Sequence, residues 1–163
     1  MSFGLPPEFF AQLGYYVVLA GHIEHTLHEM LPEWQSGLLD QKEIGARKNR
    51  GTLLKMVSQA ADKLPEDLGK DLRAFCDLLD ERSRFRHRAV HGAWFAAGGG
   101  LRNLYFEKDG AGHWRPEPME ISQEEVNEAI IDIEQLLETA HALRDRIRAY
   151  RQTPPKQTPH ASD

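Results

Sequence analysis

The sequence predicts an all-α protein: a bundle of four to five helices with a small β-hairpin inserted before the last helix. Several segments repeat apolar residues three or four positions apart, which is the period of an amphipathic helix. Residues 94–121 lack this period and contain aromatic residues and turn-forming glycines instead. The chain has 163 residues, which suits one domain, since domains commonly span roughly 100–200 residues.

The first helix is expected to begin at Pro6 and Pro7, because proline suits the first helical turn, and to end before Pro32. At about 100° per residue, Glu24 falls in the middle of its apolar face. An unpaired charge is costly to bury, so Glu24 needs a cationic partner. The apolar residues predicted on this face are Leu13, Tyr16, Val17, Ala20, Leu27 and Leu31.

Two more helices are expected between residues 52 and 90. One covers residues 52–63, and the other begins near residue 65 and continues without a break to Val90, where Gly92 offers a left-handed C-terminal cap. Cys76 is the only cysteine, so no disulfide within the chain is expected, and the cytoplasm is the plain interpretation. The apolar stripe of the longer helix consists of Leu72, Phe75, Cys76, Leu79 and Val90.

The C-terminal part predicts the hairpin, a long last helix and a tail. The hairpin turn falls at Asp109–Gly112, Trp94 is expected to pack under the hairpin, and His113–Arg115 is expected on an exposed edge. Ser122 and Glu125 have the spacing of a capping box at the start of the last helix. Residues 1–151 therefore form the predicted helical domain, and the Pro-rich residues 152–163 a disordered tail. The inward side of the last helix carries Val126, Ile130, Ile133, Leu137, Ala140, Arg144 and Ile147.

Positive charge is concentrated in one short segment of an acidic chain. The formal net charge is −5, which argues against a nucleic-acid binder that uses its whole surface but leaves a local basic site open. The residues from 82 to 91 contain no carboxylate. The helical projection places Arg82 and Arg86 on the buried stripe and Arg84 and Arg88 in solvent. The basic side chains of the segment are Arg82, Arg84, Arg86, His87, Arg88 and His91.

An inward arginine in this segment has two explanations. A guanidinium inside a bundle needs a carboxylate or a ligand, and we expect Glu24 to pair with Arg82 or Arg86. Arg86 and His91 would also suit a phosphate group, because arginine offers forked donors and histidine exchanges protons near neutral pH. The sequence leaves a structural ion pair and an anion site equally open.

The hexapeptide Arg86-His87-Arg88-Ala89-Val90-His91 resembles the signature of the HEPN superfamily, an arginine followed after a short spacing by a histidine. The resemblance implies a helical bundle with the motif near the end of its third main helix. It further implies a metal-independent endoribonuclease, in which Arg86 holds the scissile phosphate and His91 transfers a proton. The supporting or RNA-binding positions would be His87, Arg82, Glu24 and Arg88.

The same resemblance implies RNA as the ligand, a homodimer whose two motifs face one cleft, and an antitoxin or regulatory protein as a further partner in a toxin or defence system. Ala93 stands where toxins paired with small nucleotidyltransferases usually carry tyrosine, which argues against an antitoxin of that type. Two alternatives stay open. One is a non-catalytic HEPN-like bundle that binds RNA, a nucleotide or a protein, and the other is a structural dimer in which Arg86 only neutralises Glu24.

No cofactor, metal or membrane partner is expected from the sequence. The longest apolar stretch, residues 15–21, is far shorter than the roughly 20 residues that span a bilayer. Histidines in the first helix suggest a metal site, but they lie on or near its polar side, and no Cys-x-x-Cys or His-Glu-x-x-His pattern accompanies them. The residues of this weaker candidate are His22, His25, His28 and Glu29.

Overall fold

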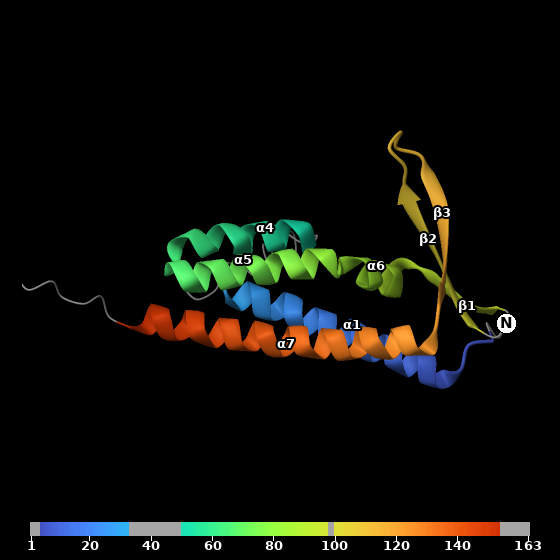
Figure 1. Cartoon of the computed structure of the whole chain (residues 1–163), viewed down its shortest axis with the longest axis horizontal. Helices are drawn as coiled ribbons and strands as arrows, with labels where there is room; N and C mark the ends of the chain where they lie inside the picture. Colours follow the sequence, from blue (N-terminus) through green and yellow to red (C-terminus); the bar gives the residue numbers. More distant parts are fainter. Residues whose placement is uncertain (1–3, 33–49, 98–99, 154–163) are drawn as a thin grey trace, which may run out of the picture.

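The computed structural model of the chain describes residues 4–32, 50–97 and 100–153. Helices α1 and α7 run along each other, α4 and α5 pack together beside them, and the sheet stands at one end of the bundle, from which one hairpin projects (Figure 1). The elements are α1 (Pro7–Glu29), α4 (Arg50–Ala60), the 3-10 turn η1 (Ala61–Lys63), α5 (Glu66–Glu81), α6 (Ser83–His91), β1 (Ala93–Ala97), β2 (Gly100–Lys108), β3 (Trp114–Ile121) and α7 (Gln123–Gln152).

The predicted fold class is wrong, because the chain is not an all-α bundle with one small hairpin. It contains a three-stranded antiparallel sheet in the order β1-β2-β3. The missed strand is β1, whose sequence AWFAA shows no alternation of apolar and polar residues. Its pairing places Trp94 opposite Asn103, and such pairing between separate segments leaves no periodic trace in the strand itself. The predicted hairpin turn is confirmed, since Asp109 Oδ1 accepts from the backbone N–H groups of Ala111 and His113.

The two longest helices begin close to where the sequence predicts. Pro7 opens α1. At the start of α7, the Ser122 hydroxyl accepts from the Glu125 N–H at 3.1 Å, and the Glu125 carboxylate accepts from the Ser122 N–H at 2.6 Å, so the capping box is complete. Val17 is an exception on α1, because its side chain is exposed rather than part of the core. The tail is predicted over residues 152–163, but α7 continues to Gln152, and residues from 154 onward lie outside the described residues.

The predicted long third helix is interrupted at Arg82, which has φ −81° and ψ 2° and separates α5 from α6. This break shifts the helical phase, so a projection drawn from α5 fails in α6. Arg88 is 1% exposed instead of solvated, whereas Arg82 and Val90 are exposed instead of buried. The projection holds within α5, where Leu72 and Leu79 are both buried.

Gly92 joins α6 to β1 in an extended conformation, with φ −81° and ψ 149°, and not in the predicted left-handed cap. Glycine is needed here for space. A Cβ atom at this position would lie 2.1 Å from the Asn103 Nδ2 and 2.6 Å from the Arg88 carbonyl oxygen. The close approach brings the end of α6 directly against β2.

The core has two parts. The larger part fills the space between the helices, and it includes Cys76, whose thiol pKa is raised to about 12, chiefly by burial. The smaller part joins the sheet to α1 and α7. The predicted packing of Trp94 is confirmed there, with its ring centroid 5.0 Å from that of Phe9. This second part sets the position of the sheet at the end of the bundle, next to the basic residues of α6.

Candidate functional site

Arg88 holds the sheet against α6. Its Nη1 donates to the Asn103 side-chain oxygen and to the Glu117 backbone carbonyl, each at 3.3 Å, and its Nη2 bonds the Glu117 carboxylate. Asn103 is fully buried and returns a hydrogen bond to the Arg88 carbonyl. With 1% exposure, Arg88 is a structural residue that no ligand reaches, so its predicted position in solvent is wrong.

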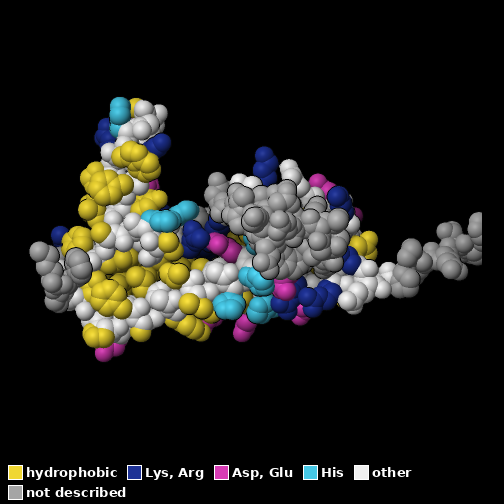
Figure 2. Space-filling model, turned by 180° about the vertical axis from the view of Figure 1, so that it is seen from behind, with side chains coloured by type: hydrophobic (Ala, Val, Ile, Leu, Met, Phe, Trp, Pro, Cys, Tyr) yellow, Lys and Arg dark blue, Asp and Glu magenta, His cyan; other side chains and the backbone are white. Residues whose placement is uncertain are grey.

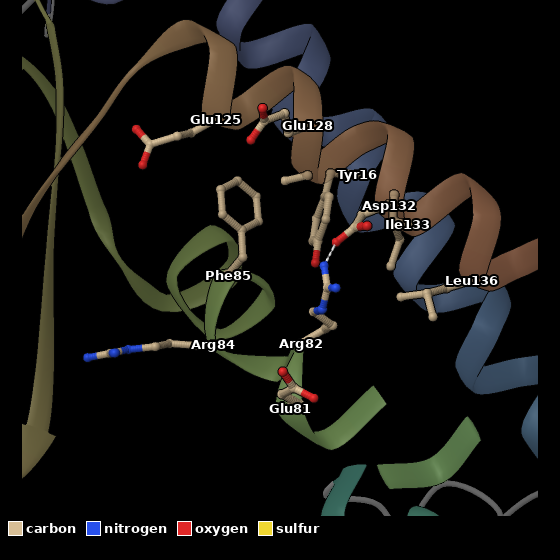
Figure 3. A pocket seen from close by; sticks show the side chains of 11 residues that line it. Tyr16, Glu81, Arg82, Arg84, Phe85, Glu125, Glu128, Asp132, Ile133 and Leu136 are labelled. Atoms are coloured by element: carbon tan, nitrogen blue, oxygen red, sulfur yellow. Dashed lines mark hydrogen bonds and ion pairs between the residues drawn. The ribbon is translucent and has the colours of Figure 1, made fainter. Parts of the chain in front are cut away.

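Arg82 and Arg84 point in different directions from the start of α6 (Figure 3). Arg82 binds Asp132 on α7, at the edge of a cavity of about 330 Å³. Arg84 points away from this cavity and binds Glu117 at 2.7 Å. Carboxylates outnumber the arginines around the cavity, so it would repel an anion. The acidic side chains that line it are Glu81, Glu125, Glu128 and Asp132.

Arg86 pairs with Glu24, as the sequence predicts. The Arg86 Nη2 lies 2.9 Å from the Glu24 Oε1, and the two side chains are 21% and 27% exposed. The pair lacks good hydrogen-bond alignment, because the Glu24 Oε1 and the Arg86 Nε are both buried without a hydrogen-bond partner among residues 4–32, 50–97 and 100–153. Arg86 is therefore less completely satisfied and less buried than Arg88.

Two helices, α4 and α6, bring positive charge together beside this pair. Burial lowers the pKa of His87 below its ordinary value of 6.5, and the nearby charges of Arg86, His91 and Arg50 lower it further. The rings of His87 and His91 lie one helical turn apart, with centroids separated by 6.2 Å. We call Arg50, Arg86, His87 and His91, together with Glu24, the His87 cluster. It has more cationic groups than Glu24 alone can neutralise.

Arg50 is the member of the His87 cluster that the sequence did not reveal. It begins α4, and its Nη2 donates to the Leu79 carbonyl oxygen at 2.7 Å. Burial lowers the Arg50 pKa, Glu24 raises it, and Arg86 lowers it again. The basic run Arg47-Lys48-Asn49-Arg50 was the available signal, but no helical period connects it with residues of α6.

His87 also lines a groove between α6 and the free edge of β2. Strand β1 pairs with β2 only as far as Leu104, so none of the described strands pairs with the rest of β2 on that side. Figure 2 shows histidine, basic and acidic side chains at the base of the hairpin, with apolar side chains along it. We call this space of about 460 Å³ the hairpin groove. Its lining is Arg84, His87, Tyr105, Phe106, Glu107, Lys108 and Trp114.

The other candidates from the sequence gain no structural support. Within the described residues, no group of three or more His, Cys, Asp or Glu side chains is arranged to hold a metal ion. This includes the histidines of α1. None of the described helices combines the length and the apolar character that crossing a membrane requires. The sequence-predicted site residues that lie together are thus Glu24, Arg86, His87 and His91, whereas Arg82 and Arg88 serve other contacts.

Comparison with known proteins gives one family. The family model of the ANTH domain matches residues 18–162, which is most of the chain. No curated protein and no solved structure matches it. The ANTH match overturns the HEPN resemblance, which depended in detail on six residues. The predicted endoribonuclease activity, the toxin or defence role, and the RNA, antitoxin and HEPN-type dimer partners depended on that resemblance and are wrong.

Proposed function

The chain belongs to the ANTH domain family, and from this membership we propose that it binds phosphorylated lipid head groups at a membrane surface. ANTH domains are associated with phosphoinositide-containing membranes and with clathrin adaptors. The family thus favours a membrane partner, contrary to the prediction from the sequence. We assign head-group binding to the His87 cluster and the adjoining hairpin groove.

The observation that carries this proposal is the gathering of cationic side chains around His87 in an acidic protein. His87 lies between Arg86 and His91 of the cluster and the Arg84 and Lys108 side chains of the groove. A head group with several phosphates needs several donors spread over its own width, and arginine binds phosphate oxygens with two parallel hydrogen bonds. Because the positive charge is local, it attracts an anionic surface only in one orientation of the protein.

The Arg86–Glu24 pair supports a site that binds reversibly. Without ligand, Glu24 balances part of the charge of Arg86 and Arg50. A phosphate that approaches the exposed part of Arg86 competes with Glu24 for the same guanidinium. Glu24 therefore limits the affinity for any single phosphate, and a head group with more than one phosphate gains from the additional donors of the groove.

The charge of His87 makes binding depend on pH. Its lowered pKa leaves the free imidazole neutral at pH 7. A bound phosphate favours the protonated imidazole, so binding takes up a proton and becomes tighter as the pH falls toward about 6. We place the protein at the cytoplasmic side of a membrane, where anionic inositol lipids are found.

The test is a titration of the purified full chain with soluble inositol trisphosphate, inorganic phosphate, and phosphatidylcholine vesicles with and without phosphatidylinositol bisphosphate. Arg86→Gln should weaken binding of inositol trisphosphate and of the inositol-lipid vesicles about tenfold, which corresponds to one lost charge-assisted contact. Inorganic phosphate should bind far more weakly than inositol trisphosphate.

The matched control is Arg73→Gln. Arg73 is a partly exposed arginine of α5 that pairs with Asp62 of η1, away from the cluster. The Arg73→Gln substitution should leave the affinities for inositol trisphosphate and for the inositol-lipid vesicles unchanged. Equal affinities for Arg86→Gln and the unsubstituted protein would remove the His87 cluster from the proposed function, and equal binding to vesicles with and without the inositol lipid would remove the function itself.

A further inference from the structure

One face of the hairpin is apolar and points away from the bundle. In the register of β2 and β3, Phe106 lies opposite Pro116, and Lys108 lies opposite Trp114, so these four side chains share a face. Phe106 and Trp114 are 50% and 64% exposed. We call these four residues the hairpin face.

The opposite face of β2 is occupied by the contacts that attach the sheet to α6. Asn103 on that face is fully buried and bonded to Arg88, and Tyr105 lies under the Arg88 guanidinium, with 5.8 Å between the guanidinium carbon and the ring centroid. Because side chains alternate along a strand, Phe106 and Lys108 point the other way. The hairpin projects from the bundle (Figure 1), so this face is accessible to a large flat partner.

Charge and shape select a lipid surface as that partner. The Lys108 ammonium lies 5.0 Å from the centroid of the Trp114 ring, and an aromatic ring beside a cation suits the boundary between lipid head groups and acyl chains. At the turn, Arg115 binds Asp109 at 2.7 Å, which neutralises the carboxylate nearest the tip. The charge of Asp109 at the turn is therefore compensated.

The free edge of β3 is poorly suited to a second copy of the chain. Pro116 and Pro118 lie in this edge strand, and neither has a backbone N–H. A strand that paired with this edge would lack two backbone N–H donors from β3. Association edge to edge, which is the usual way in which exposed strands pair, is thereby disfavoured.

We infer that Trp114 and Phe106 insert into the head-group and acyl-chain boundary of the membrane while the His87 cluster holds a phosphorylated head group. The inference rests on the proposed function. The hairpin groove connects the two parts, because its lining includes His87 of the cluster as well as Phe106 and Trp114 of the hairpin face. One membrane surface can then contact both the cations and the aromatic pair.

The test uses phosphatidylcholine vesicles that contain phosphatidylinositol bisphosphate and lipids brominated on the acyl chains. The bromine atoms quench tryptophan fluorescence only when the tryptophan ring enters the acyl-chain region. The chain has three tryptophans, so the measurement uses protein that carries Trp34→Phe. Trp114 should be quenched in that protein, and the further change Trp114→Phe should abolish the quenching, since the remaining Trp94 is buried in the protein core. Trp114→Ala should weaken vesicle binding about tenfold, as expected for the loss of one buried aromatic side chain. It should weaken binding of soluble inositol trisphosphate much less, because the soluble ligand has no acyl chains for the ring to contact.

Tyr150→Ala is the control, because Tyr150 is an exposed aromatic residue near the far end of α7; it should change neither quantity. Vesicle binding that depends on Arg86 without quenching of Trp114 overturns the insertion and leaves the proposed function intact. Quenching of Trp114 that survives Arg86→Gln supports insertion and counts against the head-group site. Self-association in light scattering that Trp114→Ala abolishes, without quenching, assigns the face to a second copy and overturns the inference.

Discussion

Two arginines of α6, separated by a single residue, lie in contrasting surroundings. Arg88 is 1% exposed and makes hydrogen bonds to Asn103 and Glu117 of the sheet, whereas Arg86 is 21% exposed and has one imperfectly aligned ion pair with Glu24. Arg88 uses its guanidinium for contacts within the fold, whereas Arg86 keeps donor groups that a ligand can use. Burial and completeness of bonding, and not residue type or position in a motif, distinguish the structural arginine from the one that we propose as a ligand-binding residue.

The largest effect is expected on the sheet side of α6. Arg88→Met should lower the free energy of unfolding by about 3–5 kcal/mol, because it leaves the buried Asn103 side chain without its partner and removes the Arg88 bonds to Glu117. Urea denaturation measures this loss. Arg84→Met is the matched control: Arg84 binds the same carboxylate and lowers the Glu117 pKa, but its side chain is 62% exposed. If the two variants are equally stable, Arg88 does not hold the sheet.

Gly92→Ala should have the next largest effect, about 1–3 kcal/mol of destabilisation, because a methyl group cannot be accommodated beside Asn103 without a shift of α6 or β2. Gly110→Ala serves for comparison, since a Cβ there would meet no atom within 4 Å. It should change stability by less than about 0.5 kcal/mol. Thermal unfolding of both variants would test whether close approach is the reason for glycine at position 92.

Glu24→Gln should destabilise the protein only moderately, by roughly 1–2 kcal/mol, because the pair is partly exposed and solvent screens the stranded charge of Arg86. The same change should strengthen binding of inositol trisphosphate, since Arg86 loses its competing carboxylate. Calorimetric titration and urea denaturation measure the two effects separately. A loss of stability as large as that of Arg88→Met, with unchanged affinity, would make the two arginines equivalent.

The smallest effect concerns His87. Its pKa in the folded state is lower than the 6.5 of an unperturbed histidine, so the unfolded chain takes up a proton first as the pH falls. This imidazole therefore costs no stability above pH 6.5 and reduces stability progressively below it. His87→Gln should remove that part of the acid sensitivity when unfolding is compared at about pH 7.5 and about pH 5.5. An unchanged pH dependence would show that the charges of the cluster do not act on His87.

Local sequence features were sufficient for most of the helical frame. The proline at the start of α1, the Ser122–Glu125 capping box and the Asp109 turn all depend on residues within a few positions of one another, and each lies where the sequence predicts. The Glu24–Arg86 pair was also predictable, because a charge on an apolar face requires a partner. The family was not, since the short arginine-histidine pattern led to HEPN, whereas the ANTH match extends over most of the chain.

The environment of each basic side chain depended on tertiary structure. The break at Arg82 changes the helical phase, and no local propensity of residues 82–91 predicts it. Helix α6 packs against both α1 and β2, and α1 is far from it in the chain. Pairing of β1 with β2 then buries Asn103 and, with it, Arg88. Sequence periodicity determines which residues share a face within one uninterrupted element. Which faces meet is determined by contacts between segments far apart in the chain, and these contacts made one arginine structural and left the other accessible.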